Sequence, residues 1–405
     1  MNKNYNPKDF FRHSSKELLQ ALFKKYEVMA EFDFSEKSQN KIVENLFKEW
    51  QTLDQEIFNR LESDFIEIHN MSNERGFQAL VDELNFHGQD LIKTCDEKKI
   101  QDIFSKVFWT YLNRESLCDK DFWTNAKHFQ KSDAIAKGRW KKRSQLGQNI
   151  AQDSDEACKQ FASDLSAFLK EKLGKGKNCQ VDVLKRERGG KQFIYYFAYP
   201  EDFSITSLEY STKNDNTLKR EYRRPAFEII FLYSQEEESL DIWHDGVGRP
   251  IIHDLQSIFC KNILSCEIQK PVKDRPEYAL DQLKNRDMIF KIDPTLGISS
   301  LAVCSLKLSS GYGCNITIDV NANENKLAIY SLLEKIEGKL DKVFLKVIRA
   351  SFIATFKKLN PDGKPITITF SISLPNNCKL QHFGEDGAIR QVLLDSGVQI
   401  NPVVK

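Results

Sequence analysis

The stretch that decides the fold runs from Pro225 to Leu264 and reads PAFEIIFLYSQEEESLDIWHDGVGRPIIHDLQSIFCKNIL. Its first part, Ala226 to Tyr233, is almost continuously apolar and rich in aromatic and β-branched side chains, which predicts a strand covered on both faces. After an acidic turn, Ser239 to His244 alternates with a period of two, as a second strand does. Pro250 then opens a segment with apolar residues at helical spacing. The stretch therefore predicts a strand–strand–helix unit whose helix packs back over its own hairpin.

The composition is that of a folded, globular protein. A chain of 405 residues is too long for one ordinary core, so two or three domains are expected. The sequence is 40% hydrophobic and 29% charged, and its 28 phenylalanines supply material for large cores. The 59 basic residues almost balance the 58 acidic ones. Affinity for nucleic acid or anionic lipid would therefore have to come from a local patch.

The sequence favours a cytoplasmic location. The first residues, MNKNYNPKDFF, lack the apolar core of a secretory signal, and no apolar run is long enough to span a bilayer. The nine cysteines are odd in number and scattered without a CxxC pair. This pattern predicts reduced thiols and no zinc held by cysteine pairs. We expect no cofactor, no metal site and no membrane partner.

The spacing of apolar residues changes from helical to alternating near residue 178, which predicts an α+β fold in two domains. Residues 1–150 are expected to form an all-α helical domain, and residues 151–405 an α+β domain of antiparallel sheets with strand–strand–helix units. The basic, polar stretch 137–149 is interpreted as the boundary, and residues 270–290 mark a candidate sub-boundary. Val343–Phe356 is not settled between helix and strand, because large apolar residues recur every four positions, at Phe344, Ile348, Phe352 and Phe356, while β-branched residues abound.

The loop that follows the second predicted strand has features of a phosphate-binding or catalytic site. It joins a strand to a helix N-terminus, where backbone amides and the helix dipole can hold a phosphate. The candidate phosphate-binding residues are Gly246, Gly248 and Arg249, and the candidate catalytic residues are Asp241, His244 and Asp245. A divergent metal-dependent nuclease or nucleotide-handling enzyme would use this set together with Arg249. The glycine spacing is incomplete and Pro250 removes an amide donor, so a plain connecting loop is the favoured interpretation.

Basic clusters with an aromatic residue or glycine beside them are the strongest binding signal. Such clusters suit phosphate contact and base stacking, although a solvated surface explains them as well. One cluster spans residues 137–143 and contains Trp140. The residues predicted to contact nucleic acid in the other two are Lys185, Arg186, Arg188, Lys191, Lys219, Arg220, Arg223 and Arg224. If these two clusters lie at neighbouring strand ends, they form one patch.

Three segments carry a resemblance: FAYPEDF (197–203), RPAFEIIFLYSQEEESLDIW (224–243) and LKNRDMIFKIDPTLGISSLAVCSLKLS (283–309). They resemble segments of uncharacterised bacterial proteins encoded beside ATPases and other genes of mobile or phage-defence loci. The resemblance brings no assigned catalytic residues. It implies a component that works with other proteins of its operon, an ATPase among them. The expected function is a non-catalytic interaction subunit of an antiviral system, which binds partner proteins and, through its basic patches, DNA or RNA.

Overall fold

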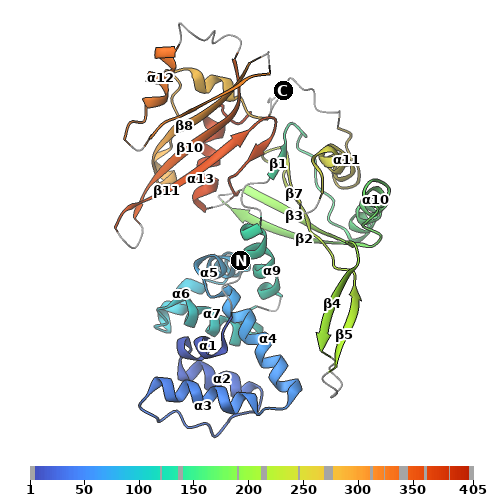
Figure 1. Cartoon of the computed structure of the whole chain (residues 1–405), viewed down its shortest axis with the longest axis vertical. Helices are drawn as coiled ribbons and strands as arrows, with labels where there is room; N and C mark the ends of the chain where they lie inside the picture. Colours follow the sequence, from blue (N-terminus) through green and yellow to red (C-terminus); the bar gives the residue numbers. More distant parts are fainter. Residues whose placement is uncertain are drawn as a thin grey trace. The chain divides into compact units, whose positions relative to one another are not determined.

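The computed structural model describes residues 5–118, 121–135, 140–188, 191–210, 217–244, 247–268, 277–310, 313–322, 324–336, 345–359, 363–382 and 384–400. The chain divides into two compact units, Met1–Ile135 and Ala136–Lys405. The first is helical and the second is built on antiparallel sheets, so the predicted α+β class is confirmed (Figure 1). No helix in the described ranges is both long enough and apolar enough to cross a membrane.

The helical unit consists of short amphipathic helices around an aromatic core. They are α1 (Pro7–His13), α2 (Lys16–Lys25), α3 (Gln39–Gln51), α4 (Gln55–Met71), α5 (Glu74–Phe86), α6 (Leu91–Glu97), α7 (Ile103–Leu112), α8 (Arg114–Leu117) and α9 (Phe122–Ile135). Several begin at a side-chain cap, as at Asp102, which accepts a hydrogen bond from the backbone N–H of Ser105 at 2.8 Å. Inside, Phe10 packs on Phe65 with ring centroids 4.5 Å apart, and Trp50 stacks on Phe58 at 4.3 Å.

The second unit contains a ten-stranded sheet. Its strands are β1 (Trp140–Arg143), β2 (Cys179–Arg188), β3 (Lys191–Pro200), β6 (Ile229–Ser234), β7 (Ser239–His244), β8 (Ile298–Ser310), β9 (Asn315–Asp319), β10 (Leu345–Leu359), β11 (Pro365–Ser373) and β12 (Asn377–Cys378). They lie in the order β2-β3-β6-β7-β1-β12-β11-β10-β8-β9, with neighbours antiparallel. Strand β1 pairs with β7 on one side and β12 on the other, so it joins two groups of strands.

The strand–strand–helix unit that the sequence predicts is present. Strands β6 and β7 form a hairpin in which Ile229 is paired with His244. A 3-10 turn, η1 (Arg249–Ile251), leads into helix α11 (Ile252–Ile263). Phe259 of this helix stacks on Phe231 of β6, with ring centroids 5.3 Å apart and planes 8° apart. Helix α10 (Asp155–Leu173) packs into the same core, where Phe161 also meets Phe231. The helix does pack back over its own hairpin.

The second group of strands is covered by α12 (Ala328–Ile336) and α13 (Gly384–Asp395), with the short 3-10 helices η2 (Leu280–Lys284) and η3 (Pro294–Leu296) beside them. The ambiguous segment from Val343 is strand β10 where the structure describes it, from Leu345 onward. Ala350, Phe352 and Ala354 are buried in alternation with less buried residues. A spacing of four is also a multiple of two, which is why this strand imitates a helix in sequence.

The basic stretch that the sequence assigns to a domain boundary is not a linker throughout. Trp140–Arg143 is strand β1, in the middle of the large sheet, and Trp140 and Lys142 are buried on alternate positions. The compact helical unit ends at Ile135, before residue 150.

Strands β4 (Ile205–Tyr210) and β5 (Leu218–Arg223) form a separate two-stranded sheet, which we call the β4–β5 hairpin. It leaves the large sheet after Pro200, and an isolated bridge between Glu201 and Ala226 closes its base. In Figure 1 the hairpin extends away from strands β2 and β3.

Candidate interaction surface and buried ionic network

In the described part of the segment from Lys185 to Lys191, the basic side chains are buried or paired and do not form an exposed basic patch. Lys185 makes an ion pair with Asp153. Arg186 is only 1% exposed, so it lies in the interior and cannot contact nucleic acid at the surface. Lys191 directs its ammonium group toward Glu237, at 3.3 Å, and toward Gln391, at 3.1 Å. Arg188 ends strand β2, and its side chain lies outside the described part of the molecule.

The two predicted clusters are also far apart. In the β2–β3 ladder Lys191 is paired with Arg188 at one end, and Pro200 with Cys179 at the other. The β4–β5 hairpin leaves from the Pro200 end. Lys185 is paired with Ile194. With a rise of about 3.3 Å per residue, roughly 20 to 30 Å of strand separates the first cluster from the Pro200 end. The condition for a single combined patch, neighbouring strand ends, is therefore not met.

The second cluster lies on the β4–β5 hairpin and is exposed. Every residue of β5 is exposed, including Lys219, Arg220 and Arg223. Large apolar and aromatic side chains lie beside these basic residues: Tyr222 is 80% exposed, Leu208 60% and Leu218 54%. Arg224, at the base, donates a hydrogen bond to Glu201 at 2.8 Å. The hairpin thus presents positive charge and apolar surface side by side.

The near-neutral charge of the chain conceals an asymmetry between its two units. Residues Met1–Ile135 include 24 acidic and 19 basic residues, whereas Ala136–Lys405 include 34 acidic and 40 basic residues. The unit that carries the β4–β5 hairpin therefore has the basic excess that favours a polyanionic partner.

The two candidate catalytic residues that the structure describes, Asp241 and His244, do not point to one site. Asp241 and His244 are three positions apart on β7, so their side chains point to opposite faces of the sheet. Asp241 is 1% exposed. Asp245 and Gly246 lie outside the described residues, Arg249 begins the turn η1, and the carbonyl of Gly248 accepts a hydrogen bond from Ile251 at 3.4 Å. Phosphate binding by Gly248 and Arg249 stays a prediction.

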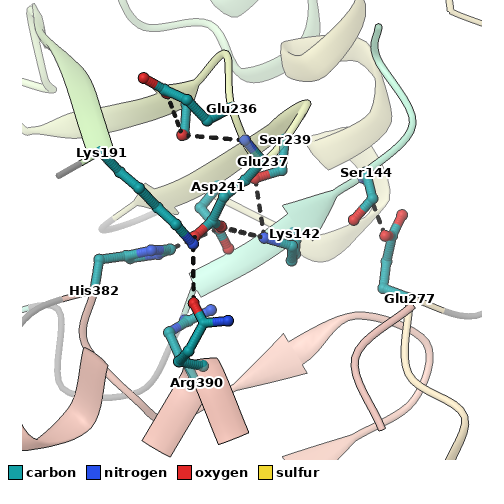
Figure 2. A network of polar contacts seen from close by, with 12 residues as sticks. Lys142, Ser144, Lys191, Glu236, Glu237, Ser239, Asp241, Glu277, His382 and Arg390 are labelled. Atoms are coloured by element: carbon teal, nitrogen blue, oxygen red, sulfur yellow. Dashed lines mark hydrogen bonds and ion pairs between the residues drawn. The ribbon is translucent and has the colours of Figure 1, made fainter. Parts of the chain in front are cut away.

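The interior of the second unit contains a network of charged side chains that the sequence did not reveal (Figure 2). We call it the Lys142 network; its members are Lys142, Lys191, Glu237, Asp241, His382 and Arg390. They come from β1, β3, the β6–β7 turn, β7, the residues before α13, and α13 itself. Within the described ranges, no group of three or more His, Cys, Asp or Glu residues is arranged to hold a metal ion.

Lys142 is the centre of this network and is only 1% exposed. Its ammonium nitrogen donates a hydrogen bond to the Ser239 hydroxyl at 2.9 Å. It lies 3.4 Å from Glu237 Oε2 and 3.6 Å from Asp241 Oδ2. Three polar partners match the three N–H donors of a lysine, which offsets the cost of removing the charge from water.

His382 and Arg390 complete the network from the other group of strands. His382 Nε2 lies 3.3 Å from Asp241 Oδ2. Arg390 donates hydrogen bonds from Nε to the carbonyl of Gln381 at 2.9 Å and from Nη2 to that of Leu380 at 2.8 Å. The network therefore connects β7 to the loop and helix that follow β12.

The pKa values of the titratable groups in the Lys142 network are set by burial and by the charges of neighbouring side chains. Burial raises the pKa of Asp241, but Lys142 and His382 outweigh it and hold that pKa below its usual range. The same balance, again led by Lys142, lowers the pKa of Glu237 to about 2. Burial and the charge of Arg390 lower the pKa of His382 to about 4, against the opposing effect of Asp241. Near neutral pH both carboxylates are ionised and His382 is neutral, so the three groups are not poised for proton transfer.

One signal in the sequence could have pointed to this network. Trp140 and Lys142 alternate with Lys141 and Arg143, as in a strand with one buried face. The signal is weak because three of the four residues are basic, and the carboxylates that pair with Lys142 are about a hundred positions away.

The chain matches no family model, and comparisons with curated proteins and with solved structures find no match either.

Proposed function

We propose that this protein is a non-catalytic interaction subunit of a bacterial multiprotein system for antiviral defence, working in the cytoplasm with proteins of its own operon. In this proposal the β4–β5 hairpin contacts DNA or RNA. The observation that carries it is the composition of this hairpin, whose exposed residues combine arginine, lysine and tyrosine. Such residues supply phosphate contacts and stacking surfaces.

The size of the hairpin supports a binding role. An isolated two-stranded sheet buries too little apolar surface to be stable by itself in water. Leu208, Leu218 and Tyr222 nevertheless remain exposed. Tyrosine and arginine are also enriched at protein interfaces, so the same hairpin suits a partner protein. The burial of Asp241 supports a non-catalytic role over a metal-dependent nuclease.

The first prediction tests nucleic-acid binding. Replacing Arg220→Glu and Arg223→Glu together should weaken the binding of DNA and RNA of any sequence. It should also reduce the slope of log affinity against log salt by about 1.4 to 1.8, because two phosphate contacts are lost. Fluorescence anisotropy with labelled oligonucleotides over a salt series measures both quantities.

The matched control reverses two exposed charges of the helical unit, Lys48→Glu with Arg75→Glu. This control changes the net charge by the same amount as the Arg220 and Arg223 variant, and it should leave the affinity for DNA and RNA nearly unchanged. If the wild-type chain has no affinity for DNA or RNA at low salt, the nucleic-acid part of the proposal is wrong. Affinity purification of the tagged protein from cells that carry its native operon tests the partner proteins.

A further inference from the structure

The two faces of the β4–β5 hairpin differ. In its antiparallel register Thr206 is paired with Tyr222 and Leu208 with Arg220. Directly opposed residues of two antiparallel strands point to the same side. One side therefore carries these four residues together with Leu218, and we call it the Tyr222 face. The other side carries Ile205 with Arg223 and Ser207 with Glu221.

The Tyr222 face is apolar and aromatic, with a cation at its centre. Tyr222 is 80% exposed, and Leu208 and Leu218 are more than half exposed. Arg220 is exposed, as is every residue of β5. The acidic Glu221 points to the opposite side. A negatively charged ligand thus meets no carboxylate from β5 on the Tyr222 face.

The exposed aromatic and apolar side chains of the Tyr222 face favour single-stranded over double-stranded nucleic acid. A duplex presents phosphates and base edges, and its bases are already stacked on one another, so exposed tyrosine and leucine side chains gain little from it. An unpaired base presents its ring face, which stacks on aromatic side chains or on a guanidinium plane. Arg220 and Tyr222 are two positions apart on β5, so they lie on the same side of the hairpin, roughly 7 Å from one another. Both can therefore contact one short segment of a single-stranded nucleic acid.

We infer that the Tyr222 face binds single-stranded DNA or RNA, with a base stacked on the Tyr222 ring and an adjacent phosphate held by Arg220. This inference rests on the proposed function and adds the class of ligand. Preference for a single strand depends on the ring of Tyr222, whereas nucleic-acid binding in general depends on the basic side chains of the β4–β5 hairpin.

The second prediction is that a single strand binds more tightly than a duplex of the same length and sequence. Tyr222→Ala should weaken binding of the single strand about 5- to 100-fold, the usual effect of losing one stacked base. Tyr222→Phe keeps the ring and should bind within about 2-fold of the wild-type chain. Thr206→Ala, on the same face but without a ring, is the matched control. Anisotropy with a labelled oligothymidylate measures each affinity at one salt concentration.

A second measurement uses the wild-type chain alone. An oligonucleotide with 5-iodouracil, cross-linked by light, should attach at Tyr222, as mapped by mass spectrometry. The inference is overturned if the duplex binds at least as tightly and Tyr222→Ala leaves the affinity for the single strand unchanged. That result leaves general nucleic-acid binding standing, because Arg220→Glu with Arg223→Glu would still weaken it. Absence of binding to either form overturns the inference and the proposed nucleic-acid contact together.

Discussion

Lys142 shows how the charge of one residue can be held inside a sheet. Transferring an ammonium group out of water costs several kcal/mol. The attraction between this group and its acidic partners offsets the cost only when the hydrogen bonds between them are well formed. Here Ser239, Glu237 and Asp241 all lie within 3.6 Å of its nitrogen. Removing Lys142 leaves the buried Asp241 and the partly buried Glu237 without their main positive neighbour. The free-energy cost of this exceeds the net contribution of the ion pair itself.

The third prediction follows from this arrangement. Lys142→Met should lower the free energy of unfolding by about 3 to 5 kcal/mol, measured by urea denaturation. Adding Asp241→Asn should recover part of the loss, since one uncompensated charge is removed. Lys172→Met breaks only an exposed pair with Glu171 and should cost less than about 0.5 kcal/mol. Equal losses for Lys142→Met and Lys172→Met would contradict a structural role for the network.

The fourth prediction concerns acid. The pKa of His382 is near 4 in the folded protein, below its usual value of 6.5, so the unfolded chain binds this proton more readily. The associated stability is complete above pH 6.5 and is lost as the pH falls toward 4, by on the order of 3 kcal/mol. Glu237 adds a further loss below about pH 4.5, since its pKa is also depressed.

Urea midpoints measured from pH 7 to pH 4 test this expectation. His382→Asn should flatten the dependence between pH 6.5 and 4, whereas replacing the exposed His13 by Asn should leave it as it is. An unchanged pH dependence in His382→Asn would show that this histidine does not titrate differently in the folded protein. The charged groups that act on His382 or share its network are Asp241, Lys142, Lys191, Glu237 and Arg390.

Among the secondary-structure elements, the local sequence pattern was enough to predict some strands but not others. The hairpin β6–β7 and helix α11 follow from apolar runs, an acidic turn and helical spacing within forty residues. Strand β1 could not be predicted in that way. Three of its four residues are basic, and it is a strand only because β7 and β12 lie on its two sides. Tertiary pairing outweighs local composition here.

The basic clusters illustrate the same limit for the candidate site. Arg186 and Arg220 both stand beside other charged residues in sequence, and nothing local separates them. Arg186 is buried within the large sheet, whereas Arg220 lies on a two-stranded sheet that is exposed. The distinction between the clusters depends on which strand joins which sheet, and the sequence alone does not show this.

At the scale of the whole molecule, the two compact units have separate cores. One apolar core contains only residues between Phe10 and Ala126, and the other two contain only residues between Leu146 and Val398. As a fifth prediction, residues 1–135 produced alone should fold, because every residue of their core is retained. Circular dichroism should give a helical spectrum and one cooperative thermal transition. A spectrum of unfolded chain would mean that this unit depends on the second one.

The position of β1 has a consequence for how the protein is made. Trp140 pairs with Cys378, so this ladder cannot close until the ribosome has synthesised the more than two hundred residues that lie between them. While synthesis continues, one edge of β1 has backbone donors and acceptors available to other chains. Completion of the sheet thus requires a large loop to close, and until then the open edge of β1 is a place where misassembly with another chain can begin.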